Sequence, residues 1–347
     1  MGIVGGLDIH RQQITFDYVD TDTGEVSVGQ IPAADRRQLA AWLAHRFADR
    51  DDRGEVEFSV EGCTGWRYVA EELTAAGMVV RLAEPAETAG ARGRKKRAKT
   101  DRADARLQRD LLLQGRLPQC WIPPTEVVEA RALLGCYHDL RRDHTAWVQR
   151  IHAVLFHQGA VPCTDLGTAP GRATLAKVAA EQLSPAGRTQ VAAAVLMLEA
   201  TEAEMGVLRR QLLLLARQMR GPRVLAERLY GVGPITALAL TCWLGGAGRF
   251  SSARKAVRFT GLDITVYSSA GKRSPGRLSR QGPAILRWCL YEAGKTHARA
   301  SAPDYAYYAA AKKRIDGKRA ALSEARKLVR QAVHILSELG DDAFTFA

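Results

Sequence analysis

The stretch GIVGGLDIHRQQITFDYVDT, residues 2–21, contains two short apolar segments joined by a polar turn. GIVGGLDIH stays apolar over the length of a strand, and ITFDYVDT largely alternates apolar and polar residues. Both patterns are typical of β-strands. GEVEFSVEG at 54–62 and MVVRLAE at 78–84 predict a third and a fourth strand. The chain therefore begins with a sheet.

Helical spacing appears between these strands. ADRRQLAAWLAHRFADR at 34–50 and GWRYVAEELTAAG at 65–77 each predict a helix, and the second ends at a glycine suited to a C-cap. Strands connected in this way predict a mixed α/β domain over residues 1–120, with helices on the faces of the sheet.

Acidic residues stand where two of the strands end and where a later helix begins. Asp8 and Glu61 follow buried strand residues, a position from which side chains enter the crevice at a sheet edge. In KTDRADA, residues 99–105, Thr100 is a candidate N-cap, and Asp101 and Asp104 lie on one side of the first turn. Helix capping and the helix dipole account for one of these two acids.

Four carboxylates brought together would form the oxygen site that Mg²⁺ prefers, and would repel one another without a cation. The site would hold one or two ions. Two ions about 4 Å apart can activate a nucleophile and stabilise a leaving oxygen in phosphodiester chemistry. No suitably spaced His and Cys ligands favour Zn²⁺. The alternative for each acid alone is an ordinary surface or capping group.

The charge of the chain indicates a polyanionic partner. Its 50 Lys and Arg against 37 Asp and Glu leave a net charge of +13, and nucleic acid is the commonest polyanion. Nine of the cations lie between Arg249 and Arg287, with Asp263 as the single acid. A second cluster, ARGRKKRAKTDR at 91–102, supplies candidate nucleic-acid contacts at Arg94, Lys95, Lys96, Arg97 and Lys99. Solvated surface is the alternative for either run.

The six cysteines, at 63, 120, 136, 163, 242 and 289, have no CxxC spacing. We expect reduced core residues of a cytoplasmic protein. No signal peptide and no run of about 18 apolar residues is found, so we expect a soluble protein that is neither exported nor bound to a membrane.

Residues 121–222 predict a long helical middle region, with one helix at 126–159 and another at 187–220. In the second helix an apolar stripe recurs at alternating spacings of three and four residues, which predicts a coiled-coil seam that separates two functional ends and joins subunits. The stripe consists of Leu198, Thr201, Met205, Leu208, Leu212, Leu215 and Met219.

Residues 223–347 predict a mainly helical C-terminal domain. AERLYGVGPITALALTCWLGG at 226–246 has the pattern of a helix-hairpin-helix, in which the backbone at Gly231 and Gly233 would bind a phosphate. A simple helix connection is the alternative.

The basic run ITVYSSAGKRSPGRLSRQG at 264–282 contains adjacent serines, Ser268 and Ser269. A serine hydroxyl needs a base or a metal to act as a nucleophile, and the nearest histidine, His297, lies a helix length away. The carboxylate site would supply the metal, while four cations hold the phosphate: Lys272, Arg273, Arg277 and Arg280. The alternative is a turn whose serines only satisfy backbone groups.

These motifs, in this order, resemble the transposases of the insertion-sequence 110 family. GLDIH, VEGCTGW and KTDRADA resemble that family's RuvC-like, RNase H-like DEDD domain, which assigns Asp8, Glu61, Asp101 and Asp104 to metal binding and catalysis. The segment from YGVGP to YEAG resembles its C-terminal domain with a catalytic serine. His10 departs from the family's small or basic residue, and Pro283 from its common asparagine.

The resemblance implies a DNA recombinase that excises and inserts its own element with Mg²⁺ and a serine nucleophile. It further implies a structured noncoding guide RNA, transcribed from the element end, that pairs with donor and target DNA. Such enzymes act as homo-oligomers, dimers or tetramers, in which the RuvC-like domain of one subunit meets the serine domain of another. We therefore expect the protein to act in the cytoplasm, at the nucleoid.

Ser269 is the favoured nucleophile because the small residues Ala270 and Gly271 follow it and allow close approach to DNA, with Ser268 as the alternative. Two other functions stay open. One is a RuvC-like, metal-dependent junction resolvase or nuclease that forms no covalent intermediate. The other is a non-catalytic nucleic-acid-binding protein, which accounts for the charge but not for the spaced carboxylates.

Overall fold

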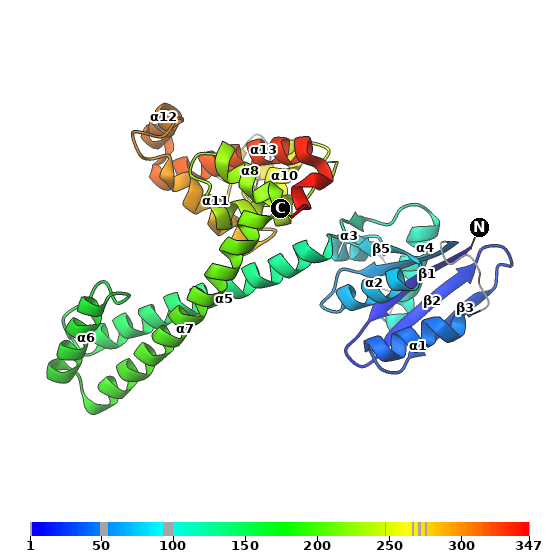
Figure 1. The fold of residues 1–347 in the computed structure, drawn as a ribbon, viewed down its shortest axis with the longest axis horizontal. Coiled ribbons are helices and arrows are strands. Elements are labelled where there is room, and N and C mark those ends of the chain that lie inside the picture. Colours follow the sequence, from blue (N-terminus) through cyan, green and yellow to red (C-terminus); the bar gives the residue numbers. More distant parts are fainter. Residues whose placement is uncertain are drawn as a thin grey trace. The chain divides into compact units, whose positions relative to one another are not determined.

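The computed structural model forms two compact units, residues 1–122 and 123–347, and Figure 1 shows the elements of each. It describes residues 2–48, 55–92, 100–246, 248–265, 267–269, 272–274 and 276–346, with the backbone alone for 267–269 and 272–274.

The first unit is built on a six-stranded mixed sheet in the order β3-β2-β1-β4-β5-β6. β1 runs parallel to β4, and β4 to β5, whereas β2, β3 and β6 join by antiparallel pairing. The strands are Ile3–Ile9 (β1), Ile14–Asp20 (β2), Val26–Ile31 (β3), Val56–Glu61 (β4), Val79–Ala83 (β5) and Gln119–Cys120 (β6). The mixed α/β fold predicted from the sequence is confirmed, but the prediction of four strands missed β3 and β6.

Adjacent glycines in β1 separate the two faces of the sheet. A Cβ on Gly5 would overlap the ring of Phe58 and lie 2.7 Å from Cβ of Tyr18, and both residues belong to the main core. A Cβ on Gly6 would overlap the carbonyl oxygen of Ala105. Successive strand residues face opposite sides, so one face packs on α1 (Arg36–Arg46) and α2 (Trp66–Ala75), and the other on α4 (Asp101–Leu113). The short helix α3 (Pro85–Gly90) follows β5.

Gly6→Ala is expected to destabilise the first unit, because the added methyl group must push α4 away from β1. Overpacking of this kind costs about 1–3 kcal/mol. Calorimetry of the full chain should show a lowered unfolding temperature. Gly90→Ala is the matched control, since its Cβ would meet nothing within 4 Å; equal effects of the two substitutions would contradict the close packing at Gly6.

The second unit begins with two long helices that lie side by side (Figure 1), α5 (Thr125–His157) and α7 (Pro185–Gln218), with α6 (Ala169–Gln182) between them in the chain. Leu198 of the α7 stripe packs in one core cluster with Ile151 and Leu155 of α5. Thr201, the polar residue of the stripe, donates to the carbonyl oxygens of Met197 and Leu198. The N-terminal part of the stripe is thus covered by a helix of the same chain; a seam between subunits stays a prediction.

The C-terminal helices pack on α9, whose residues are mostly buried, and on α13. These elements are α8 (Arg220–Arg228), α9 (Pro234–Leu244), α10 (Ala253–Phe259), α11 (Ala284–Thr296), α12 (Tyr305–Ile315), α13 (Gly317–Leu339) and a final 3₁₀ helix (Gly340–Phe344). The hairpin of β7 (Tyr267–Ser269) and β8 (Lys272–Ser274) lies between α10 and α11 in the chain.

Cys163, Cys242 and Cys289 are buried free thiols. Cys136 is exposed, so the prediction that the cysteines are core residues is wrong for this one. Among the residues that the structure describes, none of the helices combines the length and the apolar character needed to cross a membrane.

Candidate functional site

Asp8 and Glu61 lie on neighbouring parallel strands at the same end of the sheet. The last pair between β1 and β4 joins Leu7 to Val60, and each acid follows directly. Leu7 and Val60 belong to the core on one face. Because side chains alternate along a strand, both acids face the opposite side, where α4 packs.

Buried hydrogen bonds fix α4 against this face. Gln108 accepts a hydrogen bond from Ser59 of β4 and donates one to the carbonyl oxygen of Leu7 in β1. Arg109 forms an ion pair with the fully buried Asp17 of β2. The close packing at Gly6 adds to these contacts, so the first turn of α4 is held beside the strand ends.

Asp101 and Asp104 occupy that first turn. Thr100 caps the helix, its hydroxyl accepting from the backbone N–H of Ala103 at 3.2 Å. Asp104 is 8% exposed, like Asp8, whereas the Asp101 side chain is 38% exposed. The sequence therefore identified the cap correctly, and neither aspartate is needed as the N-cap.

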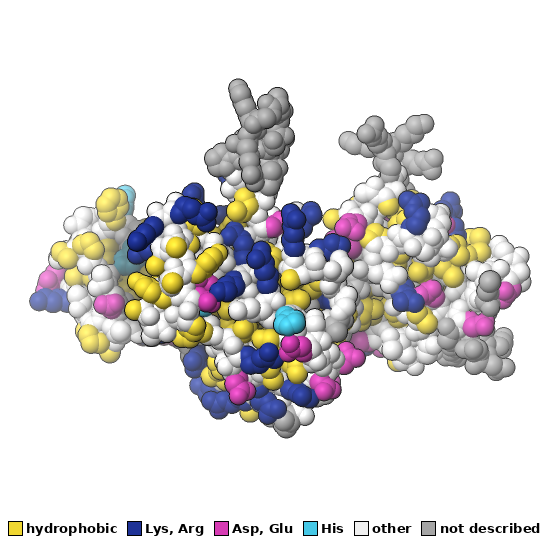
Figure 2. Space-filling model, turned by 90° about the horizontal axis from the view of Figure 1, so that it is seen from above, with side chains coloured by type: hydrophobic (Ala, Val, Ile, Leu, Met, Phe, Trp, Pro, Cys, Tyr) yellow, Lys and Arg dark blue, Asp and Glu magenta, His cyan; other side chains and the backbone are white. Residues whose placement is uncertain are grey.

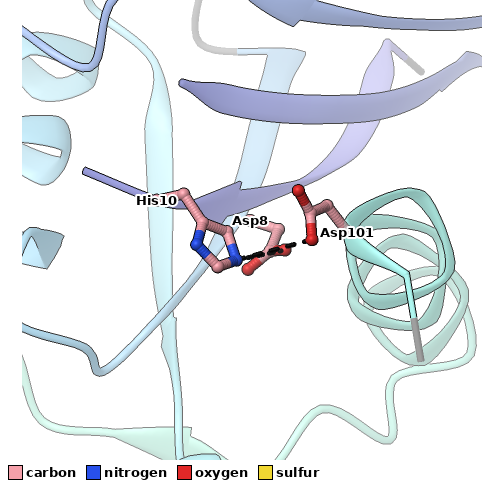
Figure 3. A group of neighbouring side chains, drawn as sticks. All are labelled: Asp8, His10 and Asp101. Carbon is pink, nitrogen blue, oxygen red and sulfur yellow. Dashed lines mark ion pairs between the residues drawn. The ribbon is translucent and has the colours of Figure 1, made fainter. Parts of the chain in front are cut away.

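His10 reaches two of the acids, and Figure 3 shows its ion pairs with Asp8 and Asp101. Its Nε2 is 3.8 Å from Asp8 Oδ2 and 3.4 Å from Asp101 Oδ1. Gln13 donates to the other Asp101 oxygen at 3.2 Å. A pocket of about 510 Å³ opens here, lined by Asp101 and the turn after β1, residues 10–13.

Arg92, which follows α3, forms an ion pair with Asp104 at 2.5 Å, Nη2 to Oδ1. The sequence indicated neither this contact nor that of His10. In the sequence, His10 is notable only as a departure from the family pattern, and Arg92 only as part of a basic cluster. Their proximity to the acids depends on how distant segments pack, which no local pattern shows.

Burial raises the pKa of Asp8 from its ordinary 3.8 to about 6. His10 acts in the opposite direction, and the remaining contributions come from the charges of Asp104, Asp101 and Glu61, which raise the pKa. The charges of the three other predicted carboxylates thus all act on Asp8.

Asp8→Asn is expected to stabilise the metal-free protein at neutral pH. Since the folded-state pKa of Asp8 exceeds the unfolded-state value, the folded protein loses stability as the pH rises from about 4 to about 6. The asparagine removes this penalty, which is on the order of 3 kcal/mol. Calorimetry in chelator should show a higher unfolding temperature at pH 7.5 and little gain near pH 4. Asp22→Asn, in an exposed turn, should change neither value; a gain independent of pH would contradict the assignment.

The donor set fits a hard divalent cation. It consists of carboxylates, two of them buried, and the four acids repel one another unless a cation is present. Asp8, His10 and Asp101 each offer one ligand atom within 4.8 Å of the others. Thr15, paired with Asp8 across β1 and β2, has a buried hydroxyl without a hydrogen-bond partner among the described residues.

The serine run forms the outer part of a two-stranded arm. At its base, Arg280 donates from its backbone N–H to Gly261, Ser279 to Asp263, and Thr265 to Arg277. Arg326 of α13 donates to the carbonyl oxygen of Leu262, at 2.7 Å, and anchors this base. The Ser279 hydroxyl donates to Asp263, the single acid of the basic stretch.

Beyond this base, backbone pairing places Ser268 opposite Arg273 and Ser269 opposite Lys272. The run contains a hairpin, with two of the four predicted phosphate-binding cations across from the serines. The other two, Arg277 and Arg280, are exposed. On the face drawn in Figure 2, Lys and Arg side chains outnumber acidic ones.

The other predicted nucleic-acid contacts have mixed outcomes. Arg94, Lys95, Lys96, Arg97 and Lys99 lie outside the described residues. Gly231 has a φ of 76°, and a Cβ there would overlap the hydroxyl of Thr296, so helix packing alone requires this glycine. Around Gly233, which caps α9, the space for a Cβ is open.

Comparisons with known proteins match both units. A family model described as "Transposase IS116/IS110/IS902 family" matches residues 224–309, and the model of the DEDD transposase domain of the IS110 group, described as "Transposase", matches residues 5–157. A "Probable family 20 transposase" of Pseudomonas aeruginosa is 27% identical over 308 residues, 86% of this chain and 84% of that protein. The resemblance seen in the sequence is thereby confirmed: the chain belongs to the IS110 family of transposases, enzymes that recombine DNA.

Proposed function

We propose that this transposase cuts and rejoins DNA through a phosphoserine intermediate. Mg²⁺, as one or two ions, would be held by Asp8, Glu61, Asp101 and Asp104. The observation that supports this most is the parallel pairing of β1 with β4, which brings Asp8 and Glu61 to one end of the sheet, where the hydrogen bonds of Gln108 hold α4. A cation bound there would also offset the charges of the other three acids, which add to the larger effect of burial on the pKa of Asp8.

When bound, the metal polarises the scissile phosphate and stabilises the charge that develops during transfer. The protein supplies rigidity around it. The hydrogen bonds of Gln108 and the ion pair of Arg109 keep the carboxylates in place before the substrate arrives.

Ser269 is the proposed nucleophile. Its hydroxyl oxygen bonds to phosphorus, its proton passes to solvent, and the departing sugar oxygen takes up a proton as the phosphodiester bond breaks. The phosphoserine conserves the energy of that bond, so a second strand can be joined without an external energy source. Lys272, Arg273, Arg277 and Arg280 would hold the phosphate. Ser268 is the alternative nucleophile.

The active form is proposed to be a homo-oligomer, dimer or tetramer, guided at the nucleoid by a noncoding RNA. Its RuvC-like unit and serine arm would come together within or between subunits. The test incubates the purified chain with DNA containing element ends and target, with and without the transcript of the flanking noncoding segment, in Mg²⁺ or chelator. A protein–DNA adduct that survives denaturation, and requires both Mg²⁺ and the transcript, supports the proposal. Cleavage without any adduct supports a resolvase instead.

Nucleic-acid binding is expected to weaken steeply with salt. Each neutralised phosphate of duplex DNA contributes roughly 0.9 to the slope of log affinity against log salt. Arg277→Ala should lower that slope by about 1, whereas Arg188→Ala, on an exposed surface of α7, should leave it unchanged. Equilibrium binding across a salt series measures both, and a flat profile for the parent protein would exclude an electrostatic interface.

A further inference from the structure

A second group of ligand-type side chains lies in the C-terminal unit. His297 is the C-cap of α11, Asp304 is the N-cap of α12, and Glu324 lies inside α13. One nitrogen or oxygen from each lies within 4.8 Å of the others. The distance from His297 Nδ1 to Glu324 Oε2 is 3.8 Å, too long for a hydrogen bond.

Close packing of two helices creates this proximity. A Cβ on Gly294 of α11 would overlap the carbonyl oxygen of Ala321 in α13. His297 and Glu324 each lie three residues from this contact, within one turn of helix. The close approach at Gly294 is therefore next to the imidazole and the carboxylate.

Glu324 is buried without a hydrogen-bond partner. His297 is 2% exposed and Glu324 0%, and among the described residues no hydrogen bond reaches either carboxylate oxygen of Glu324. Buried polar groups are normally hydrogen-bonded, and each exception requires an explanation, such as a bound ion or water. Asp304 forms an ion pair with Lys327 at 2.8 Å. The group therefore has the ligand atoms of a cation site, and its innermost carboxylate lacks a hydrogen-bond partner.

We propose that His297, Asp304 and Glu324 bind one divalent transition metal ion of the zinc type. One imidazole with two carboxylates suits Zn²⁺ better than Mg²⁺, which prefers oxygen ligands alone, and a water molecule would complete four-coordination. The ion joins α11, α12 and α13. It also fixes the ring of His297, against which Tyr230 packs edge-on at 5.3 Å, just before the turn between α8 and α9. The role is structural and separate from the carboxylate site of the first unit.

The test uses the full chain carrying Asp8→Asn and Asp101→Asn, which removes both carboxylates of the ligand group in the first unit. After removal of metal with a chelator, titration with Zn²⁺ alone should show one equivalent bound, a raised unfolding temperature, and no such rise with Mg²⁺. Co²⁺ in the same protein should give an absorption spectrum of an ion in a nitrogen and oxygen environment.

Glu324→Gln and Asp304→Asn are each expected to weaken Zn²⁺ binding at least about 100-fold, since even outer-shell changes cost 10–100-fold, and to abolish the rise in unfolding temperature. Asp304 is partly exposed, so its variant tests the proposal even where Glu324→Gln does not fold. The matched control is Glu292→Gln, an exposed acid of α11 paired with Lys295. No bound equivalent in the parent, or unchanged affinity in Asp304→Asn, would show a buried histidine and glutamate pair only. Neither result bears on DNA cleavage.

Discussion

Replacing Asp8 by asparagine is expected to lower DNA strand cleavage by at least about 10³-fold, the scale of losing one main electrostatic element of a phosphoryl-transfer site. The asparagine keeps the shape of the side chain but removes the charge that the metal needs. Because the same substitution is expected to stabilise the metal-free fold, loss of activity here cannot follow from unfolding. Single-turnover cleavage of a labelled element end measures the effect.

Asp110→Asn is the matched control. This aspartate lies on the same helix as Asp101 and Asp104, two turns further on, and pairs with Arg109. Arg109 keeps its partner Asp17, so cleavage should stay within a few-fold of the parent. Cleavage retained by Asp8→Asn would exclude the carboxylate metal site, and equal losses in both variants would indicate a general effect of charge on DNA binding.

Ser269→Ala is expected to abolish the covalent protein–DNA adduct, with a fall in strand joining of at least about 10³-fold, because no other atom at this position can form the ester. DNA binding and Mg²⁺ binding should be unchanged, since the hydroxyl contributes to neither. Electrophoresis under denaturing conditions, with labelled DNA, detects the adduct.

Ser268→Ala decides between the two adjacent serines, and Ser301→Ala, at an exposed position after α11, controls for the loss of any surface hydroxyl. An adduct that persists in Ser269→Ala and disappears in Ser268→Ala reassigns the nucleophile. Persistence in both variants removes the serine mechanism and leaves the resolvase mechanism, in which water attacks.

The carboxylates could be predicted from the sequence because each has a local signal. Asp8 and Glu61 follow apolar strand residues, and Asp101 follows the N-cap Thr100. Parallel pairing of β1 with β4 then brings the two strand-terminal acids to one edge of the sheet. Nothing local predicts His10 or Arg92, whose contacts exist only after the turn and α3 have packed.

The elements missed in the sequence lack the pattern that burial imposes. β3 is an edge strand in which Val26 and Val28 are 49% and 39% exposed. Its apolar residues therefore do not mark a buried face of the strand. At the start of α6, Pro170 and Gly171 resemble a break. The proline instead occupies the first turn, where its missing N–H costs little, and Thr168 caps the helix by accepting from Gly171.

The alternation of β1 allows its two faces to be engineered separately. Odd-numbered positions such as Ile3 and Leu7 belong to the core, while even-numbered Gly6 and Asp8 face α4 and the carboxylates. A thermostable variant can therefore be sought by repacking odd positions, because the proposed carboxylate site lies on the other side of the strand. An insertion or deletion of one residue in β1 would exchange the two sets and remove stability and chemistry together.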